Sequence, residues 1–240
     1  MTALDGVSVA VPSGHTVGLV GESGSGKSTL AKAILGIAPI AAGRVLLDGT
    51  DVRGLGRRER RAFLRRVRLI PQDPYSSLNP RRTIGQTLAE AVDPVHARGK
   101  RHREAIEAAL HEVALPADAA GRYPHEFSGG QRQRVAIARA LITRPEVVIA
   151  DEITSALDVS VQAEVLRLLD RLRRELNLTM LFISHNLAVV EQVSDEIVVL
   201  RHGKLIESGP VGEVFTTPRS DYTRALLAAV PGGAPTKGAE

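Results

Sequence analysis

The sequence contains no cysteine among its 240 residues. This absence excludes disulfide bonds, iron–sulfur clusters and zinc sites with thiolate ligands. Aromatic residues make up only 3% of the chain, which argues against a surface that stacks nucleic-acid bases. The apolar runs are far shorter than the roughly 20 residues that a membrane-spanning helix needs, so we expect any role at a membrane to pass through partner proteins.

The charge balance is only mildly positive. The chain carries 31 basic and 27 acidic residues, a net charge of +4, which is too small to indicate a nucleic-acid partner. Residues 57–68 are rich in arginine, but Glu59 interrupts them and their helical spacing predicts a solvated helix rather than a surface for nucleic acid or anionic lipid. Three histidines lack the close spacing of metal ligands and the thiolate or carboxylate groups that accompany such ligands in a metal site. We therefore interpret His96, His102 and His111 as surface residues.

Short β-branched segments alternate with helical patterns, which predicts an α/β fold with a largely parallel sheet. The expected strands cover residues 16–20, 45–47, 67–70, 147–150, 180–183 and 197–200. After residue 156, apolar positions at helical spacing predict one long amphipathic helix. Between residue 73 and about residue 140 the strand pattern disappears, and helices are expected near residues 83–92, 101–113 and 131–142, which predicts an inserted helical subdomain.

A glycine-rich loop follows the first expected strand. It reads Gly21, Glu22, Ser23, Gly24, Ser25, Gly26, Lys27, Ser28 and Thr29, and a helix-like segment comes next. The glycines allow backbone N–H groups to surround a phosphate, and the helix N-terminus adds positive charge. Lys27 would neutralise the β- and γ-phosphates and the Ser28 hydroxyl would bind Mg²⁺. The loop alone leaves kinases, GTPases, helicases and transport ATPases as alternatives.

A second apolar strand, residues 147–150, ends in two carboxylates, Asp151 and Glu152. This pattern looks like a Walker B strand, whose carboxyl end faces the nucleotide in an open α/β sheet. Asp151 is the candidate Mg²⁺ ligand. Glu152 is the candidate group that orients the water attacking the γ-phosphate.

A third motif begins at Ser128, which is suited to cap a helix, and continues with Gly129, Gly130 and Gln131. This run resembles the signature motif of the ATP-binding cassette (ABC) ATPases, with Phe127 where leucine is commonest. Further motifs of that family follow its order along the chain. Gln72 matches the Q-loop, residues 155–158 match the D-loop, and His185 matches the switch histidine.

The resemblance implies a P-loop NTPase with a RecA-like core of residues 1–72 and 144–230 and a helical subdomain of about residues 73–143. Residues 231–240 are rich in glycine, proline and alanine without periodicity, which predicts a disordered tail. The resemblance also implies ATP and Mg²⁺ as cofactors. The implied catalytic residues are Glu152, His185 and Gln72, and the implied metal ligands are Ser28, Gln72 and Asp151. In the family two cassettes dimerise head to tail, so that residues 128–131, with Asp158 of the D-loop, complete a nucleotide site on the opposite copy.

Three stretches resemble the branch of oligopeptide, dipeptide and nickel importers, namely residues 71–81, 184–187 and 222–227. The branch implies an ATPase subunit at the cytoplasmic face of the membrane. Its partners would be a second cassette, identical or different, the permease subunits and, indirectly, an extracytoplasmic solute-binding protein. The alternatives are a nickel or other solute importer, a non-transport ABC ATPase that acts as a clamp on DNA or ribosomes, and a cassette that binds ATP without hydrolysing it.

Two features of the branch are missing from this sequence. The opening strand and the aromatic residue that stacks on adenine would precede Met1, which is compatible with a truncation or with half of a fused double cassette, and leaves open how adenine is bound. The usual His-Pro-Tyr element of the C-terminal extension is replaced by Ser220 and Asp221 before Tyr222. The transported solute is not readable from these residues, because a cassette contacts only ATP and neighbouring proteins.

Overall fold

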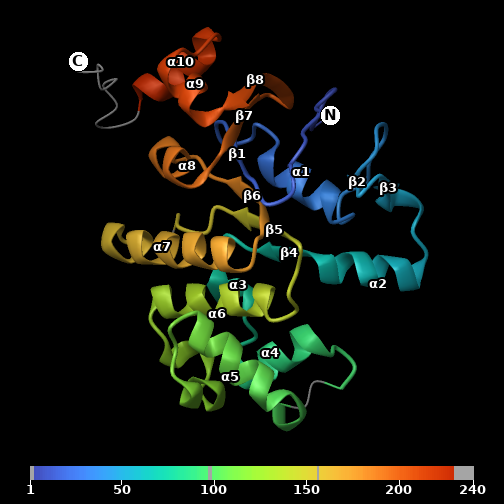
Figure 1. The fold of residues 1–240 in the computed structure, drawn as a ribbon, viewed down its shortest axis with the longest axis vertical. Helices are drawn as coiled ribbons and strands as arrows, with labels where there is room; N and C mark the ends of the chain where they lie inside the picture. The colour runs from blue at the N-terminus through green and yellow to red at the C-terminus, as the bar shows by residue number, and fades with distance from the viewer. Residues whose placement is uncertain (1–2, 97–98, 156, 230–240) are drawn as a thin grey trace. The chain divides into compact units, whose positions relative to one another are not determined.

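The computed structural model describes residues 3–96, 99–155 and 157–229 (Figure 1). They form two compact units. We call residues 1–55 with 179–240 the terminal unit and residues 56–178 the central unit. The predicted boundaries of the helical subdomain, at 72/73 and 143/144, stay a prediction. The predicted disorder of residues 231–240 concerns residues outside the described part of the chain.

The sheet of the terminal unit is built around β1 (Thr16–Val20), whose residues are all buried. β1 is parallel to β6 (Thr179–Ile183) on one side and to β7 (Glu196–Arg201) on the other, with Leu19 beside both Ile183 and Val198. The last strand, β8 (Lys204–Pro210), runs antiparallel to β7. Continuous apolar runs such as β1 and β6 are typical of parallel strands that are covered on both faces.

The other elements of the terminal unit are short. They are α1 (Lys27–Ile34), the hairpin strands β2 (Leu46–Leu47) and β3 (Thr50–Asp51), the 3₁₀ helix η1 (Val52–Gly54), α8 (Leu187–Val193), α9 (Val211–Thr216) and α10 (Asp221–Ala228). α8 packs closely on β1, because a Cβ atom added to Gly18 would lie 2.4 Å from Cγ1 of Val190. Asp195 ties the start of β1, accepting the Thr16 N–H at 2.7 Å.

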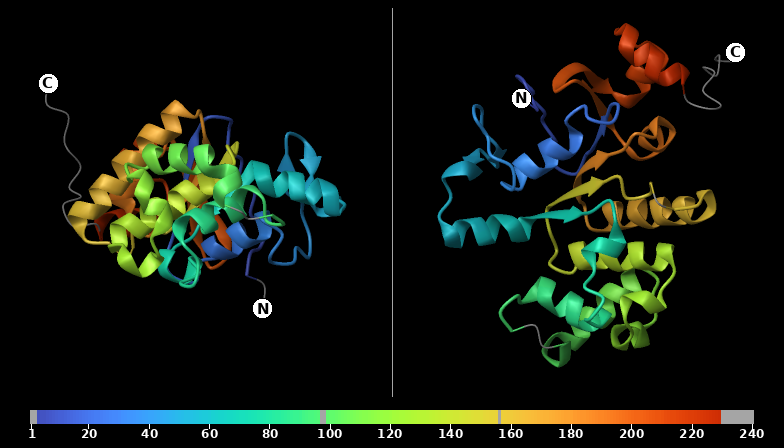
Figure 2. Two further views of the ribbon diagram at one scale, coloured as in Figure 1. Left: turned by 90° about the horizontal axis from the view of Figure 1, so that it is seen from below. Right: turned by 180° about the vertical axis from the view of Figure 1, so that it is seen from behind.

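The central unit contains a parallel strand pair, β4 (Val67–Ile70) and β5 (Val147–Asp151), in which Ile70 lies beside Ala150. The described residues between these strands form helices and 3₁₀ turns and no strand. The helical elements of this unit are α2 (Arg57–Arg66), α3 (Pro74–Ser77), α4 (Ile84–Val92), η2 (Gly99–His102), α5 (Arg103–Glu112), η3 (Ala117–Gly121), η4 (Pro124–Glu126), α6 (Gly129–Leu141) and α7 (Val159–Glu175). Figure 2 shows α6 and α7 side by side, and the two helices are in contact.

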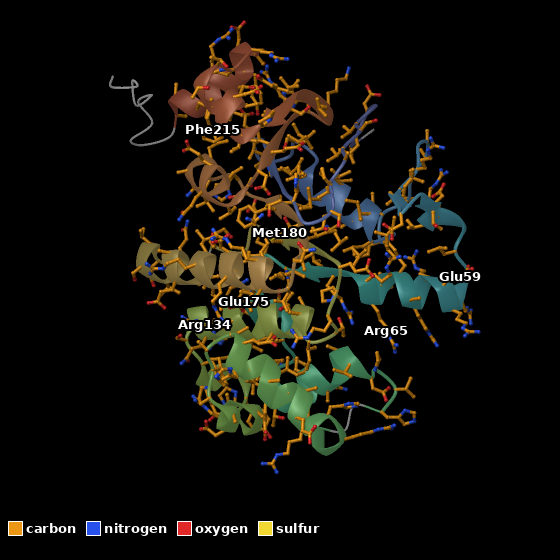
Figure 3. All side chains as sticks on the ribbon, in the orientation of Figure 1. Glu59, Arg65, Arg134, Glu175, Met180 and Phe215 are labelled. Carbon is orange, nitrogen blue, oxygen red and sulfur yellow. The ribbon has the colours of Figure 1, made fainter. Side chains whose placement is uncertain are left out.

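The arginine-rich segment forms the predicted solvated helix, α2. Its first turn is closed by Glu59, whose carboxylate accepts the Gly56 N–H at 2.9 Å. Figure 3 shows Glu59 near the beginning of this helix and Arg65 further along it. Arg65 is exposed, whereas Phe63 is 4% exposed and anchors the opposite face. The helix therefore buries one apolar side and keeps its charges hydrated.

Every strand expected from the sequence is present, with its ends shifted by at most one residue. The strand pattern of β8 was missed, because its residues are mostly exposed and the buried one is Glu207 rather than an apolar residue. α8, α9 and α10 were missed as well, and they are too short for a clear helical period. Within the described residues, no helix combines the length and apolar character needed to cross a membrane.

Candidate nucleotide site

The glycine loop, residues 21–29, follows β1 in the terminal unit, as predicted, and its last three residues form the start of α1. Gly21 has φ of 151°, and a Cβ atom at this position would lie 2.2 Å from the Leu200 carbonyl oxygen. Gly26 has φ of 108° and precedes the first helical residue, so α1 starts without a capping side chain. Both positions require glycine, because other residues rarely adopt these angles and have no room for Cβ.

Lys27 is 5% exposed and curls back over the loop that precedes it. Its ammonium donates to the carbonyl oxygens of Gly21 at 2.7 Å and Glu22 at 2.9 Å, and lies 3.5 Å from Oγ of Ser25. A buried ammonium needs such acceptors, since an uncompensated charge would be costly to desolvate. The loop therefore places a cation where a phosphate group can be received.

His185 comes to the same edge of the terminal unit as the glycine loop. β1 and β6 are adjacent parallel strands, and Ser184 continues the pairing by donating its N–H to the Leu19 carbonyl at 3.2 Å. The segments that leave the two strands therefore emerge at one sheet edge. His185 is exposed, and Asn186 after it caps α8 by accepting the Ala188 N–H at 3.1 Å.

In the central unit, parallel pairing of β4 and β5 brings Gln72 to Glu152. The side-chain amide of Gln72 donates to Oε2 of Glu152 at 2.9 Å. Asp151 is the last residue of β5 and Glu152 follows with φ of 45°, a left-handed conformation that turns the chain sharply away from the strand. Ser155 closes this turn, since its N–H and Oγ both donate to the Glu152 carbonyl, at 3.1 Å and 2.9 Å.

Ser128 caps α6, as its position in the sequence predicted. Its Oγ accepts the Gln131 N–H at 3.3 Å, and Oε1 of Gln131 accepts the Ser128 N–H at 3.0 Å. This reciprocal capping box satisfies two of the backbone donors at the helix start. The N–H groups of Gly129 and Gly130 have no acceptor among the described residues, so this helix end can still receive an anion.

The start of α6 lies against the start of α7 and the segment before it. A Cβ atom on Gly129 would be 3.7 Å from Leu157, and one on Gly130 would be 2.4 Å from Cγ1 of Val161. The signature and D-loop segments are therefore neighbours within the central unit. Ala156, also part of the predicted D-loop, lies outside the described residues.

Asp158 caps α7 by accepting the Val161 N–H at 3.0 Å and the Ser160 hydroxyl at 2.7 Å. These hydrogen bonds, the one from the Val161 N–H first, hold the pKa of the Asp158 carboxyl below its usual range. The carboxylate therefore stays ionised at neutral pH and complements the positive end of the helix.

Replacing Gly130 by alanine is expected to lower the free energy of unfolding by about 1–3 kcal/mol, because the new methyl group overlaps Val161. Urea denaturation measures this change. Gly121→Ala is the matched control, since a Cβ atom there meets nothing within 4 Å. Adding Val161→Ala to Gly130→Ala should recover part of the loss. Equal stability of the Gly130 and Gly121 variants would contradict the close helix contact.

Arg132 connects two of the motifs, a role that the sequence did not reveal. It is 8% exposed, and its guanidinium donates to the Pro124 carbonyl at 2.7 Å. The same guanidinium lies 3.8 Å from the ring centroid of Tyr75, which belongs to α3 after Gln72. A second arginine of α6, Arg139, donates to the Ser77 carbonyl at the end of α3. The signature helix and the Q-loop segment are thus joined by two arginine side chains.

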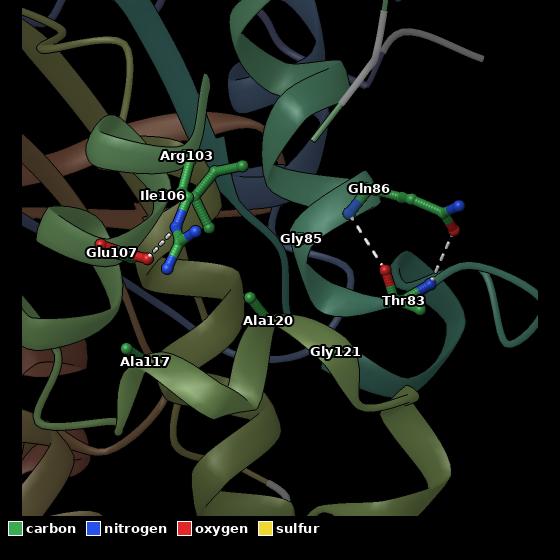
Figure 4. A pocket seen from close by; sticks show the side chains of 9 residues that line it. All are labelled: Thr83, Gly85, Gln86, Arg103, Ile106, Glu107, Ala117, Ala120 and Gly121. Atoms are coloured by element: carbon green, nitrogen blue, oxygen red, sulfur yellow. Dashed lines mark hydrogen bonds and ion pairs between the residues drawn. The ribbon is translucent and has the colours of Figure 1, made fainter. Parts of the chain in front are cut away.

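A separate pocket of about 340 Å³ lies among α4, α5 and η3 of the central unit (Figure 4). Its polar side chains bind one another: Arg103 donates to Glu107 at 2.7 Å, and Thr83 and Gln86 form the capping box of α4. Ile106 contributes an apolar wall. None of the nucleotide-site residues predicted from the sequence lines this pocket, so we do not place the nucleotide there.

The comparisons with known proteins agree with these motifs. The profile of the ABC transporter family matches residues 4–155. The oligopeptide transport ATP-binding protein OppF of Escherichia coli is 47% identical over 233 residues, which cover 96% of this chain and 70% of OppF.

Two solved structures share the fold. CbiO1 of Clostridium perfringens, part of an ABC transporter complex, superposes with a TM-score of 0.80 at 28% identity, covering 90% of this chain and 84% of its own. The ATP-binding cassette MJ0796, a dimer bound to ADP and Pi, gives a TM-score of 0.76 at 28% identity, covering 87% of this chain and 90% of its own.

The glycine loop, the paired strand ends and the capped signature helix are the parts that a nucleotide-hydrolysing cassette requires. Both the profile match and the OppF similarity cover more than half of the chain. The chain therefore belongs to the ABC transporter family and is one of its ATPases.

Proposed function

We propose that this chain is the subunit that binds and hydrolyses ATP to power an importer of oligopeptides. The observation that carries the proposal is the similarity to OppF, which extends over 96% of the chain. The transported peptide would be handled by permease and solute-binding subunits, since a cassette supplies only the free energy of ATP hydrolysis. The chain would then work as a peripheral subunit on the cytoplasmic face of the membrane, in contact with the permease.

In this proposal, the loop of residues 21–29 surrounds the phosphates of ATP. Its backbone N–H groups and the Lys27 ammonium neutralise the β- and γ-phosphates. His185 contacts the γ-phosphate, which fits its exposed position beyond the strand next to β1. The geometry of Lys27 supports this assignment, because the loop carbonyls of Gly21 and Glu22 orient its ammonium.

The donor set suits Mg²⁺, because Ser28, Asp151 and Gln72 offer hydroxyl, carboxylate and amide oxygens, the hard ligands this ion prefers. We assign these three residues to it. When bound, Mg²⁺ would neutralise charge on the β- and γ-phosphates. The Gln72 amide donates through its nitrogen to Glu152, so its oxygen remains for the metal or the attacking water.

Glu152 is assigned as the residue that orients the attacking water and accepts its proton. Its carboxylate is fixed by the Gln72 amide, and its backbone by the turn that Ser155 closes. Fixing a base in this way lowers the entropy cost of reaching the reactive geometry. A change at Gln72 would therefore alter the orientation of Glu152.

We further propose that a second cassette, identical or different, completes each nucleotide site. Ser128, Gly129, Gly130 and Gln131 would bind the γ-phosphate held by the other copy, with Asp158 of the D-loop beside them. The N–H groups of Gly129 and Gly130, which have no acceptor among the described residues, support this role. The dimer of MJ0796 with ADP and Pi is a structural relative in which two cassettes associate.

The test is purification of the chain from membranes together with its partners, followed by measurement of phosphate release. We expect a peptide permease to co-purify with the chain. We also expect the rate of ATP hydrolysis to rise when a peptide-loaded binding protein is added. A permease that responds to nickel or another solute would reassign the cargo. Nucleic acid or ribosomes in place of a permease would overturn the proposal.

A further inference from the structure

The C-terminal helix α10 is fixed to β8 by a buried carboxylate. Glu207 is 7% exposed and accepts the N–H groups of Arg219 at 2.8 Å and Ser220 at 3.1 Å. Ser220 then caps α10 by accepting the Tyr222 N–H at 3.2 Å. Because the segment before the helix is tied at these points, the side chain of Tyr222 starts from a defined backbone position.

Tyr222 reaches the glycine loop from this helix. Its hydroxyl oxygen accepts the Glu22 N–H at 3.3 Å, a contact between residues 200 positions apart. The guanidinium of Arg201, at the end of β7, lies over the face of the Tyr222 ring, 4.6 Å from its centroid. Burial raises the pKa of Tyr222, so the phenol is neutral at physiological pH.

The peptide group between Gly21 and Glu22 is bonded at both ends. Its carbonyl oxygen, from Gly21, accepts the Lys27 ammonium at 2.7 Å, and its N–H, from Glu22, donates to Tyr222. A peptide group is planar and rotates as one unit. Any rotation that loses the Tyr222 contact therefore also moves the oxygen that orients Lys27.

The end of β7 and the turn after it also contact the glycine loop. The Gly203 N–H donates to the Ser25 carbonyl at 3.0 Å, and the Leu200 carbonyl lies directly against Gly21. Among the described residues, the hydrogen bonds to the Gly21–Glu22 peptide group itself come from Lys27 and Tyr222.

We propose that Tyr222 is a positioning residue of the nucleotide site, which holds the Gly21–Glu22 peptide in the orientation that presents Lys27 to the phosphates. This inference rests on the proposed function of the loop as an ATP site. It makes α10 a support of the glycine loop, although the helix follows that loop by about 200 residues. Tyr222 acts through the loop and does not itself contact ATP.

Tyr222→Phe tests the proposal, because it removes the hydroxyl and keeps the ring under Arg201. Loss of one hydrogen bond that orders the loop is expected to raise the dissociation constant of Mg²⁺-ATP about two- to tenfold, measured by calorimetry. At saturating ATP the hydrolysis rate should be unchanged, since the reacting groups are intact. Tyr123→Phe, which removes a hydroxyl from a stacked ring in the central unit, is the matched control and should bind as wild type.

Amide hydrogen exchange distinguishes a local effect on the glycine loop from a general loss of stability. In Tyr222→Phe the Glu22 amide should exchange faster without a loss of melting temperature relative to Tyr123→Phe. Arg201→Gln keeps the Tyr222 hydroxyl but removes the guanidinium that lies over the Tyr222 ring. We expect a smaller increase in both the dissociation constant of Mg²⁺-ATP and the exchange rate of the Glu22 amide. This variant also provides a second test if the first variant fails to fold.

The results separate this inference from the proposed function. Unchanged ATP affinity in Tyr222→Phe, or weaker binding without faster exchange at Glu22, would overturn the role of Tyr222. If Lys27→Ala also binds ATP like wild type, then the assignment of the loop itself fails. If Lys27→Ala loses ATP while Tyr222→Phe does not, only the inference about Tyr222 is wrong.

Discussion

Replacing Glu152 by glutamine is expected to slow ATP hydrolysis by about 100- to 10,000-fold, the range that a positioned general base contributes. The amide keeps the shape of the side chain and still offers an oxygen to Gln72, whose amide donates to Oε2 of Glu152 at 2.9 Å. It loses the negative charge that, in the proposed mechanism, orients the attacking water and accepts its proton. ATP binding should persist, because in the proposed site the glycine loop, and not Glu152, binds the phosphates. Phosphate release and equilibrium ATP binding measure the two effects separately.

Glu146→Gln is the matched control for this variant. Glu146 also belongs to the central unit, but its carboxylate binds Arg66 at the surface, with Nε 2.7 Å from Oε1. The same chemical change there should leave hydrolysis within about twofold of wild type, since surface ion pairs contribute little. Near-normal turnover of Glu152→Gln would show that another group acts on the water.

Replacing Lys27 by alanine is expected to weaken ATP binding by about 10- to 100-fold, the effect of losing a charge-assisted hydrogen bond to phosphate. The variant also removes the ammonium that donates hydrogen bonds to the carbonyl oxygens of Gly21 and Glu22. The loop should then be less ordered, so part of the loss would come from the cost of ordering it on binding. Titration calorimetry with Mg²⁺-ATP gives the dissociation constant.

Lys32→Ala serves as the control for Lys27→Ala, because Lys32 is an exposed lysine of the same helix, α1. Its removal changes the net charge equally and should leave ATP affinity within about twofold, since an exposed charge is screened by solvent. Comparable losses in both variants would point to a general electrostatic effect rather than a phosphate site at the loop. Unchanged affinity in Lys27→Ala would remove the loop from the site altogether.

The sequence by itself determined the parts whose chemistry is local. The glycine loop could be predicted because its glycines, lysine and serine have a fixed spacing between an expected strand and an expected helix. The capping of α6 was readable because Ser128 and Gln131 stand three residues apart. Strand positions followed from apolar runs, and parallel pairing of neighbouring strands then brings Gln72 to Glu152.

Only the tertiary structure decided contacts between residues that are far apart and carry no local pattern. β8 was missed because its inward residue is Glu207, whose burial is offset by the N–H groups of Arg219 and Ser220. Tyr222 meets Glu22 only because β7, β8 and α10 return the chain to the glycine loop. Spacing along the sequence reports which face of an element is apolar, but the partner of a single polar side chain depends on how the elements pack. The glycine loop was therefore predictable, whereas its contact with Tyr222 near the other end of the sequence was not.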